Sequence, residues 1–86
     1  MGDYTIGFAR PARKELEALD SVVVRRIFPR IEALAGTPRP AGCRKLQGEN
    51  NLWRIRIGDY RVIYAIYDKD THIDIIAVRH RSEAYK

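Results

Sequence analysis

The segment LWRIRIGDYRVIYAI, residues 52–66, constrains the fold more than any other part of this chain. Two runs of alternating apolar and polar residues flank Gly58 and Asp59, and such alternation predicts β-strands. Glycine in the first central position favours a two-residue type II′ turn, which joins neighbouring antiparallel strands. A two-residue loop also places Arg56 directly opposite Arg61. The segment therefore predicts a tight hairpin with a fixed register.

The predicted pairing sorts the hairpin side chains onto two faces of a sheet, because directly opposed residues share a face. One face carries Arg54, Arg56 and Arg61, while the hairpin's acid, Asp59, lies in the turn. Like charges in opposed positions destabilise a sheet by a few tenths up to about 1 kcal/mol. The cluster is therefore either a solvated surface or a preformed anion site, most simply for nucleic acid phosphates. The predicted core face carries Trp53, Ile55, Ile57, Tyr60, Val62 and Tyr64.

The rest of the chain predicts an α+β fold in a single domain, residues 1–86. An N-terminal strand precedes two helices, and three or four antiparallel strands follow, with the helix pair packed on one face of the sheet. Pro29 is the anomaly, because a proline inside a helix removes a hydrogen bond and predicts a kink or break near residues 25–28. The expected strands are 3–9, 43–48, the hairpin and 72–80, and the expected helices are 10–20 and 22–36.

The charge balance is basic, with 16 Lys and Arg against 11 Asp and Glu. Only four of the 16 are lysines, so twelve are arginines, whose planar forks match phosphate groups. This balance suggests a polyanionic partner. Cys43 is the single cysteine and excludes an internal disulfide, and no apolar run reaches the roughly 20 residues of a membrane helix. We expect a soluble cytoplasmic protein without a membrane partner.

The C-terminal segment VRHRSEAYK adds further candidates to the arginine cluster. A three-residue turn before the last strand would place Arg79 opposite Arg61. A four-residue turn would instead place Val78 there and put His80 on the arginine side. The sequence leaves both registers open. His80 matters because it is the titratable base near neutral pH in this region.

Three segments together resemble a known family: IEALAGTPRPAGCRKLQG, LWRIRIGDYRVIYAI and AVRHRSEAYK. They are similar in order and spacing to the RelE/ParE superfamily of toxins from type II toxin–antitoxin systems, and to its RelE branch. The resemblance implies a ribosome-dependent mRNA endonuclease that cuts in the decoding site by attack of the substrate's own 2′-OH. It implies no metal and no cofactor, and it implies a RelB-type antitoxin, the ribosome and mRNA as partners.

The resemblance also implies roles for individual residues. Some family members carry lysines where this chain has Arg54 and Arg56, and arginine is a poor general base. His80 and Tyr85 are therefore the stronger candidates for proton transfer, with Glu49 as a looser match. The candidate catalytic residues are Arg54, Arg56, Arg61, Arg79, His80 and Tyr85, and the candidate RNA-binding residues are Lys45, Arg54, Arg56, Arg61 and Arg81.

Two alternatives to the endonuclease remain open. One is a ParE-like toxin that binds and poisons DNA gyrase without catalysis, in which case His80 and Tyr85 would be dispensable. The other is a degenerate member that only binds its antitoxin. The arginine cluster fits all three, because phosphates and acidic protein segments are both anions.

Overall fold

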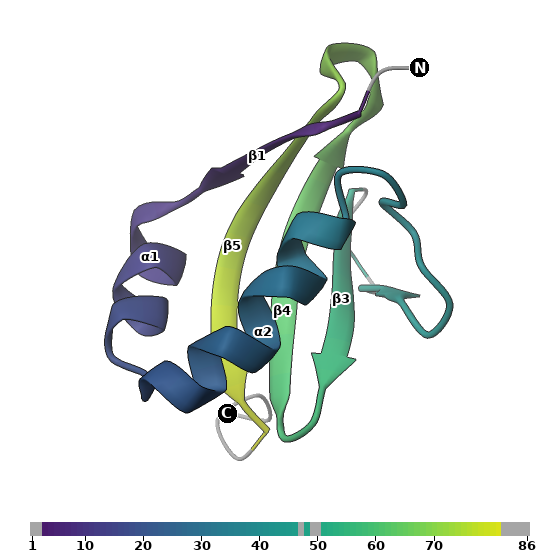
Figure 1. Cartoon of the computed structure of the whole chain (residues 1–86). Coiled ribbons are helices and arrows are strands. Elements are labelled where there is room, and N and C mark those ends of the chain that lie inside the picture. Colours follow the sequence, from purple (N-terminus) through teal and green to yellow (C-terminus); the bar gives the residue numbers. More distant parts are fainter. Residues whose placement is uncertain (1–2, 47, 49–50, 82–86) are drawn as a thin grey trace.

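The computed structural model describes residues 3–46, 48 and 51–81. Its strands form one five-stranded sheet in the order β1-β5-β4-β3-β2 (Figure 1). Neighbouring strands are antiparallel except for β1, which runs parallel to β5. The elements are β1 Thr5–Phe8, α1 Arg10–Glu17, α2 Ser21–Ala33, β2 Arg44–Lys45, β3 Leu52–Ile57, β4 Tyr60–Tyr67, the short 3-10 helix η1 Asp68–Asp70 and β5 His72–His80. The α+β prediction is confirmed, with four strands after the helices.

The β3–β4 hairpin has the predicted register. Ile57 pairs with Tyr60 across the turn, and Arg56 pairs with Arg61. Gly58 has a φ of 59°, and among the described non-glycine residues only Thr71 has a positive φ. A positive φ at the first central position alone is the pattern of a type II′ turn, so glycine is needed there for backbone reasons.

The β4–β5 pair combines features of both registers that the sequence left open. Four residues separate Tyr67 from its partner His72, so the loop is the longer one. The register then shifts by one residue, and Ile76 is left without an opposed residue. Because of this β-bulge, the last part of β5 has the alignment that a three-residue loop would have given. As a result Arg79 lies opposite Arg61.

Both helices lie over one side of the sheet. In Figure 1, α2 crosses in front of β4 and β3, and α1 flanks β5 beyond the end of β1. α2 continues unbroken through Pro29, so a break near residues 25–28 is wrong. The helix is held by its buried positions Ile27 and Ile31, which lie on either side of the proline. Packing thus outweighs the lost backbone hydrogen bond.

The core lies between the helices and the predicted core face of the hairpin. Ile55, Ile57, Val62 and Tyr64 are each at most 3% exposed, and Trp53 and Tyr60 pack against them. Phe28 on α2 is not part of this core. It is 37% exposed and stacks on Phe8 from β1. No helix in the described part of the chain is both long and apolar enough to span a membrane.

Candidate functional site

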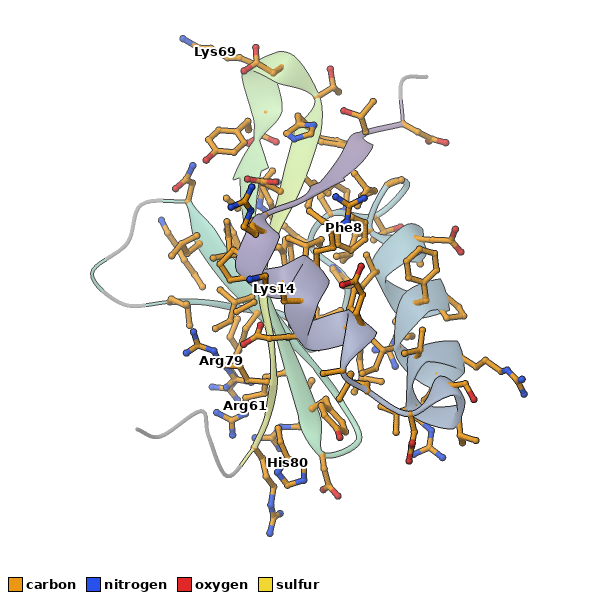
Figure 2. The ribbon with its side chains drawn as sticks, turned by 90° about the vertical axis from the view of Figure 1, so that its left-hand side faces the viewer. Phe8, Lys14, Arg61, Lys69, Arg79 and His80 are labelled. Atoms are coloured by element: carbon orange, nitrogen blue, oxygen red, sulfur yellow. The ribbon has the colours of Figure 1, made fainter. Side chains whose placement is uncertain are left out.

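The sheet has a second face, opposite α2, on which arginines gather. Arg56, Arg61 and Arg79 are directly opposed on β3, β4 and β5, and so they form a row across three strands. Figure 2 shows Arg61 and Arg79 projecting from the side of the sheet away from α2. Arg54 follows the same parity on β3, and its opposed residue on β2 is Arg44. We call these five residues, Arg44, Arg54, Arg56, Arg61 and Arg79, the arginine face.

The arginine face is only partly exposed to solvent. Arg54 and Arg61 are half-buried, while Arg56 and Arg79 are exposed. Partial burial weakens screening by water and salt, so the attraction of these groups for an anion exceeds that of fully solvated arginines. The mutual repulsion of the row rises for the same reason. An anion bound at this face therefore relieves an unfavourable interaction as well as forming a favourable one.

A carboxylate from α1 contacts the arginine face, which the sequence did not reveal. Glu15 Oε1 accepts a hydrogen bond of 2.8 Å from the backbone N–H of Val78, and its Oε2 lies 3.5 Å from Arg79 Nε. Val78 follows the part of β5 that pairs with β1, so Glu15 takes the position that a neighbouring strand would fill. The signal in the sequence is slight: a glutamate on a helix that must pass the unpaired edge of the last strand.

His80 lies on the other face of the sheet. It is opposite Tyr60, and the two rings make an edge-to-face contact with centroids 5.2 Å apart. Tyr60 belongs to the core face, so the His80 side chain is separated from the neighbouring Arg79 by the parity of the strand. Figure 2 places His80 at the end of the sheet, next to the region of Arg61. The structure therefore brings the four candidate arginines together but does not place His80 in their row.

The remaining candidates lie in different places. Lys45 is opposite Trp53 and so has the parity of the core face, although it is exposed at the sheet edge. Arg81 follows β5, and its backbone N–H donates a 2.7 Å hydrogen bond to the Asp59 carbonyl. Tyr85 and Glu49 lie outside the described residues. Among the residues that the structure does describe, no cluster of three or more His, Cys, Asp or Glu forms a metal-binding group.

A second arginine contact lies at the opposite end of the sheet. Arg39 Nη2 donates a 3.0 Å hydrogen bond to Asp68 Oδ2, and the guanidinium lies 4.9 Å from the centre of the Trp53 ring. The Tyr4 hydroxyl donates to Asp68 Oδ1 at 2.7 Å. These hydrogen bonds, first that of Arg39, lower the pKa of Asp68, and the bond to Asp68 raises the pKa of Tyr4. The Asp68 carboxylate therefore compensates the charge of Arg39.

The fold is that of a toxin from a type II toxin–antitoxin system. Residues 6–85 match the family described as the ParE toxin of type II toxin–antitoxin system, parDE. RelE1 of Methanocaldococcus jannaschii is 32% identical over an alignment of 86 positions, which covers 96% of this chain and 96% of that protein. The chain belongs to this family, within the RelE/ParE superfamily of toxins.

Solved structures agree with this assignment. The archaeal RelE–RelB complex from Pyrococcus horikoshii contains a chain that is 31% identical, with a TM-score of 0.82, over 94% of this chain and 98% of that one. The isolated RelE toxin of E. coli is 28% identical, with a TM-score of 0.80, over 95% and 90% of the two chains. A RelBE2 complex from Mycobacterium tuberculosis is 28% identical, with a TM-score of 0.81, over 92% and 99%. The predicted superfamily is confirmed, and the structural likeness is to RelE toxins.

Proposed function

We propose that this toxin is a ribosome-dependent endonuclease that cuts mRNA in the decoding site. The observation that carries the proposal is the row of Arg56, Arg61 and Arg79 across three strands, on the face that α2 leaves uncovered. In the reaction, the 2′-OH of the mRNA attacks the adjacent phosphorus while the bond to the 5′-oxygen breaks. The products are a 2′,3′-cyclic phosphate and a free 5′-OH. Such a toxin acts in the cytoplasm, where ribosomes are.

Cations are what this row offers to the reaction. The pentacovalent transition state carries more negative charge on its phosphoryl oxygens than the ground state does, and preorganised donors stabilise that charge. Arg61 lies in the middle of the row and is half-buried, so we assign it the largest share. The row supplies no general base, because arginine holds its proton at any physiological pH. Proton transfer falls to His80, Tyr85, Glu49 or a ribosomal group.

The direct test is cleavage of mRNA by the purified protein, with and without programmed ribosomes. We expect cleavage only with ribosomes, and loss of cleavage in Arg61→Ala. Arg25→Ala is the matched control, because Arg25 is an exposed arginine on α2. Intact mRNA on programmed ribosomes would contradict the proposal, as would equal activity of the Arg61→Ala and Arg25→Ala variants.

A gyrase poison is the second candidate, favoured by the description of the matching family as a ParE toxin. In that case the arginine face serves as a protein contact and no chemistry takes place. A supercoiling assay with purified gyrase separates the two functions. Inhibition of supercoiling, combined with intact mRNA on ribosomes, would assign the protein to this second function.

We also propose that a RelB-type antitoxin neutralises the toxin. Structures of similar chains in complexes with RelB support such a partner. The net charge of +5 and the arginine face favour an acidic segment of the antitoxin, since complementary potentials speed association. Calorimetric titration with the cognate antitoxin should show tight binding that weakens in the Arg61→Ala variant. Equal affinity for both proteins would place the antitoxin contact elsewhere.

A further inference from the structure

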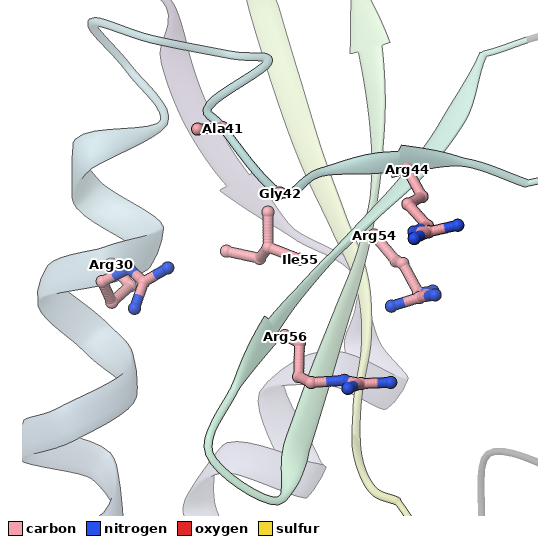
Figure 3. Close-up of a pocket in the computed structure, with 7 residues that line it drawn as sticks. All are labelled: Arg30, Ala41, Gly42, Arg44, Arg54, Ile55 and Arg56. Atoms are coloured by element: carbon pink, nitrogen blue, oxygen red, sulfur yellow. The ribbon is translucent and has the colours of Figure 1, made fainter.

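A groove opens beside β3, at the edge of the sheet. Its volume is about 530 Å³, and it lies between α2, the loop before β2 and the β3 strand (Figure 3). Three of its four arginines belong to the arginine face, and the fourth comes from α2. We call it the arginine groove, and it is lined by Arg30, Ala41, Gly42, Arg44, Arg54, Ile55 and Arg56.

Among the described residues that line the arginine groove, every charge is positive. All the charged residues that line it are arginines, and they come from α2, β2 and β3. In Figure 3, Arg30 reaches from α2 toward β3, while Arg54 and Arg56 project on the far side of the strand. A groove of this kind attracts a ligand with more than one negative charge.

The strand edge inside the groove adds backbone groups to the arginines. β2 pairs with β3 only at Trp53 and Arg54, so the β3 edge at Arg56 faces the groove instead of another strand. Ile57 and Tyr60 close the two-residue turn, and the alternation of hydrogen bonds in an antiparallel pair then points the Arg56 backbone away from β4. The Arg56 N–H therefore points into the groove, where it is available to a ligand.

The groove offers little to a protein side chain. Its apolar lining consists of Ala41, Gly42 and Ile55, and Ile55 is 2% exposed. Protein interfaces depend on large apolar or aromatic anchors in pockets. A second groove between the two helices is of that kind, and it is lined by Leu16, Glu17, Leu19, Ser21, Val24, Arg25 and Phe28. A protein segment thus fits the groove between the helices better, and a phosphate chain fits the arginine groove.

We propose that the arginine groove binds a backbone phosphate of single-stranded RNA next to the nucleotides on the arginine face. Arg54 and Arg56 line both surfaces, so one strand can lie on the face and continue around the β3 edge toward α2. Arg30 is the distal contact of this path and belongs to the groove alone. The proposal rests on the proposed function, since it assigns an additional phosphate subsite to the same RNA.

The test compares Arg30→Ala with Arg25→Ala. Both arginines are exposed on α2, and each substitution removes one positive charge, but Arg25 lines the apolar groove instead. The probe is a single-stranded 2′-O-methyl RNA oligonucleotide, which binds but lacks the nucleophile for cleavage. Its affinity for the purified protein is measured by fluorescence anisotropy over a range of NaCl concentrations.

The expected result is specific to Arg30. Loss of one phosphate contact lowers the slope of log affinity against log salt by about 0.7 for a single strand. Over one decade of salt, from 1 M to 0.1 M, this change amounts to about fivefold in affinity. Arg25→Ala should leave the slope unchanged. Arg30→Lys keeps the charge and should retain most of the slope. Arg30→Gln, which removes the charge but keeps a longer side chain, replaces Arg30→Ala if the alanine variant does not fold. Equal effects of Arg30→Ala and Arg25→Ala would overturn the proposal, because net charge alone would then explain them.

Two further outcomes keep this proposal separate from the endonuclease. If the protein binds the oligonucleotide through Arg30 but leaves mRNA intact on ribosomes, the RNA subsite in the groove is supported and the endonuclease activity is wrong. If the protein cuts mRNA but its affinity for the oligonucleotide does not depend on Arg30, the endonuclease activity is supported and the RNA subsite in the groove is wrong. An acidic peptide, polyglutamate, forms the last arm. If it binds more tightly than the oligonucleotide and depends on Arg30, the groove is a protein contact and the RNA subsite is wrong.

Discussion

The two ends of the sheet use arginine in different ways. Near η1, Arg39 is bound by Asp68 and lies over Trp53, so its charge and its planar surface both have partners within the fold. Near the Gly58 turn, Arg61 is flanked by an arginine on each side in the row across the sheet. The first arrangement stabilises the native state. The second places like charges in opposed positions of a sheet, an arrangement suited to binding an anion.

This difference predicts opposite consequences for substitutions at the two ends. Near η1 the free energy of unfolding should fall while RNA cleavage is unchanged. On the arginine face cleavage should fall while the free energy of unfolding changes little or rises.

The largest expected effect belongs to Arg61→Ala. Removal of a preorganised donor to a developing charge lowers the rate by about 100- to 1,000-fold, and single-turnover cleavage on programmed ribosomes measures it. Arg39→Ala is the matched arginine at the paired end. It should retain full cleavage and show a lower midpoint of urea unfolding. A loss below twofold in Arg61→Ala, or an equal loss in both variants, would abolish the distinction between the two ends.

The next effect concerns the loop that carries Arg39. The buried Tyr64 hydroxyl donates a 2.8 Å hydrogen bond to the Pro38 carbonyl, and burial raises the pKa of Tyr64 far above its usual range. The hydroxyl is therefore a neutral donor at all physiological pH values. Tyr64→Phe should lower the free energy of unfolding by about 1–2 kcal/mol, because the carbonyl loses its partner.

Urea denaturation measures this change, and Tyr67→Phe is the control, since Tyr67 is 41% exposed. RNA cleavage by Tyr64→Phe should equal that of the unchanged protein at temperatures well below unfolding. A stability change in Tyr67→Phe as large as that in Tyr64→Phe would show that the bond to Pro38 contributes nothing specific.

The register of the two hairpins shows what the sequence can and cannot predict. The β3–β4 pairing follows from residues 57–60 alone, because a two-residue turn with glycine first allows one register. The β4–β5 pairing depends on a bulge at Ile76. An apolar run such as residues 75–78 carries no mark of where an extra residue is inserted. The final position of Arg79 therefore required the structure.

The candidate site was predictable to the extent that it lies on the hairpin. Arg54, Arg56 and Arg61 share a face by strand parity alone. Contacts between distant segments were not predictable, among them that of Glu15 with Arg79 and the approach of Arg30 to β3. These depend on where the helices pack. His80 shows the reverse case, since a one-residue bulge decides on which face it lies.

Glu15 connects the two modes of arginine use. Its carboxylate is fixed by the Val78 N–H, and it contacts Arg79 at Nε, which leaves the terminal nitrogens of that guanidinium for a ligand. Glu15→Gln keeps an acceptor for Val78 but removes the charge beside Arg79. We expect a two-part result. The non-cleavable oligonucleotide should bind at least as tightly, because a negative charge is gone, while cleavage slows by about two- to fivefold as Arg79 loses its fixed orientation.

Glu17→Gln is the matched control, because Glu17 is an exposed glutamate on the same helix. It should have the same effect on the net charge without a change in the rate of cleavage. A Glu15→Gln variant whose binding and cleavage change in parallel would indicate a simple charge effect and remove the positioning role.

The smallest effect is the pH dependence of the Arg39–Asp68 contact. The folded state holds the pKa of Asp68 below its unfolded value, first through the hydrogen bond from Arg39 and then through that from Tyr4. A depressed carboxylate pKa contributes stability above the unfolded pKa of about 4, and that contribution is lost as the pH falls through the folded pKa. Asp68→Asn lacks this titration. The difference in Tm between the unchanged protein and Asp68→Asn should therefore be largest above about pH 4 and shrink as the pH falls further.

Asp70→Asn is the control for this comparison, since Asp70 is exposed in the same 3-10 helix. Its Tm should follow that of the unchanged protein over the acidic range. High salt should reduce the Asp68 effect, because the contact is solvent-exposed and screened. A difference in Tm that stays constant from pH 7 to pH 2 would mean that the Asp68 charge does not contribute. Arg39 would then be held by Trp53, and the two ends of the sheet would differ in packing rather than in charge pairing.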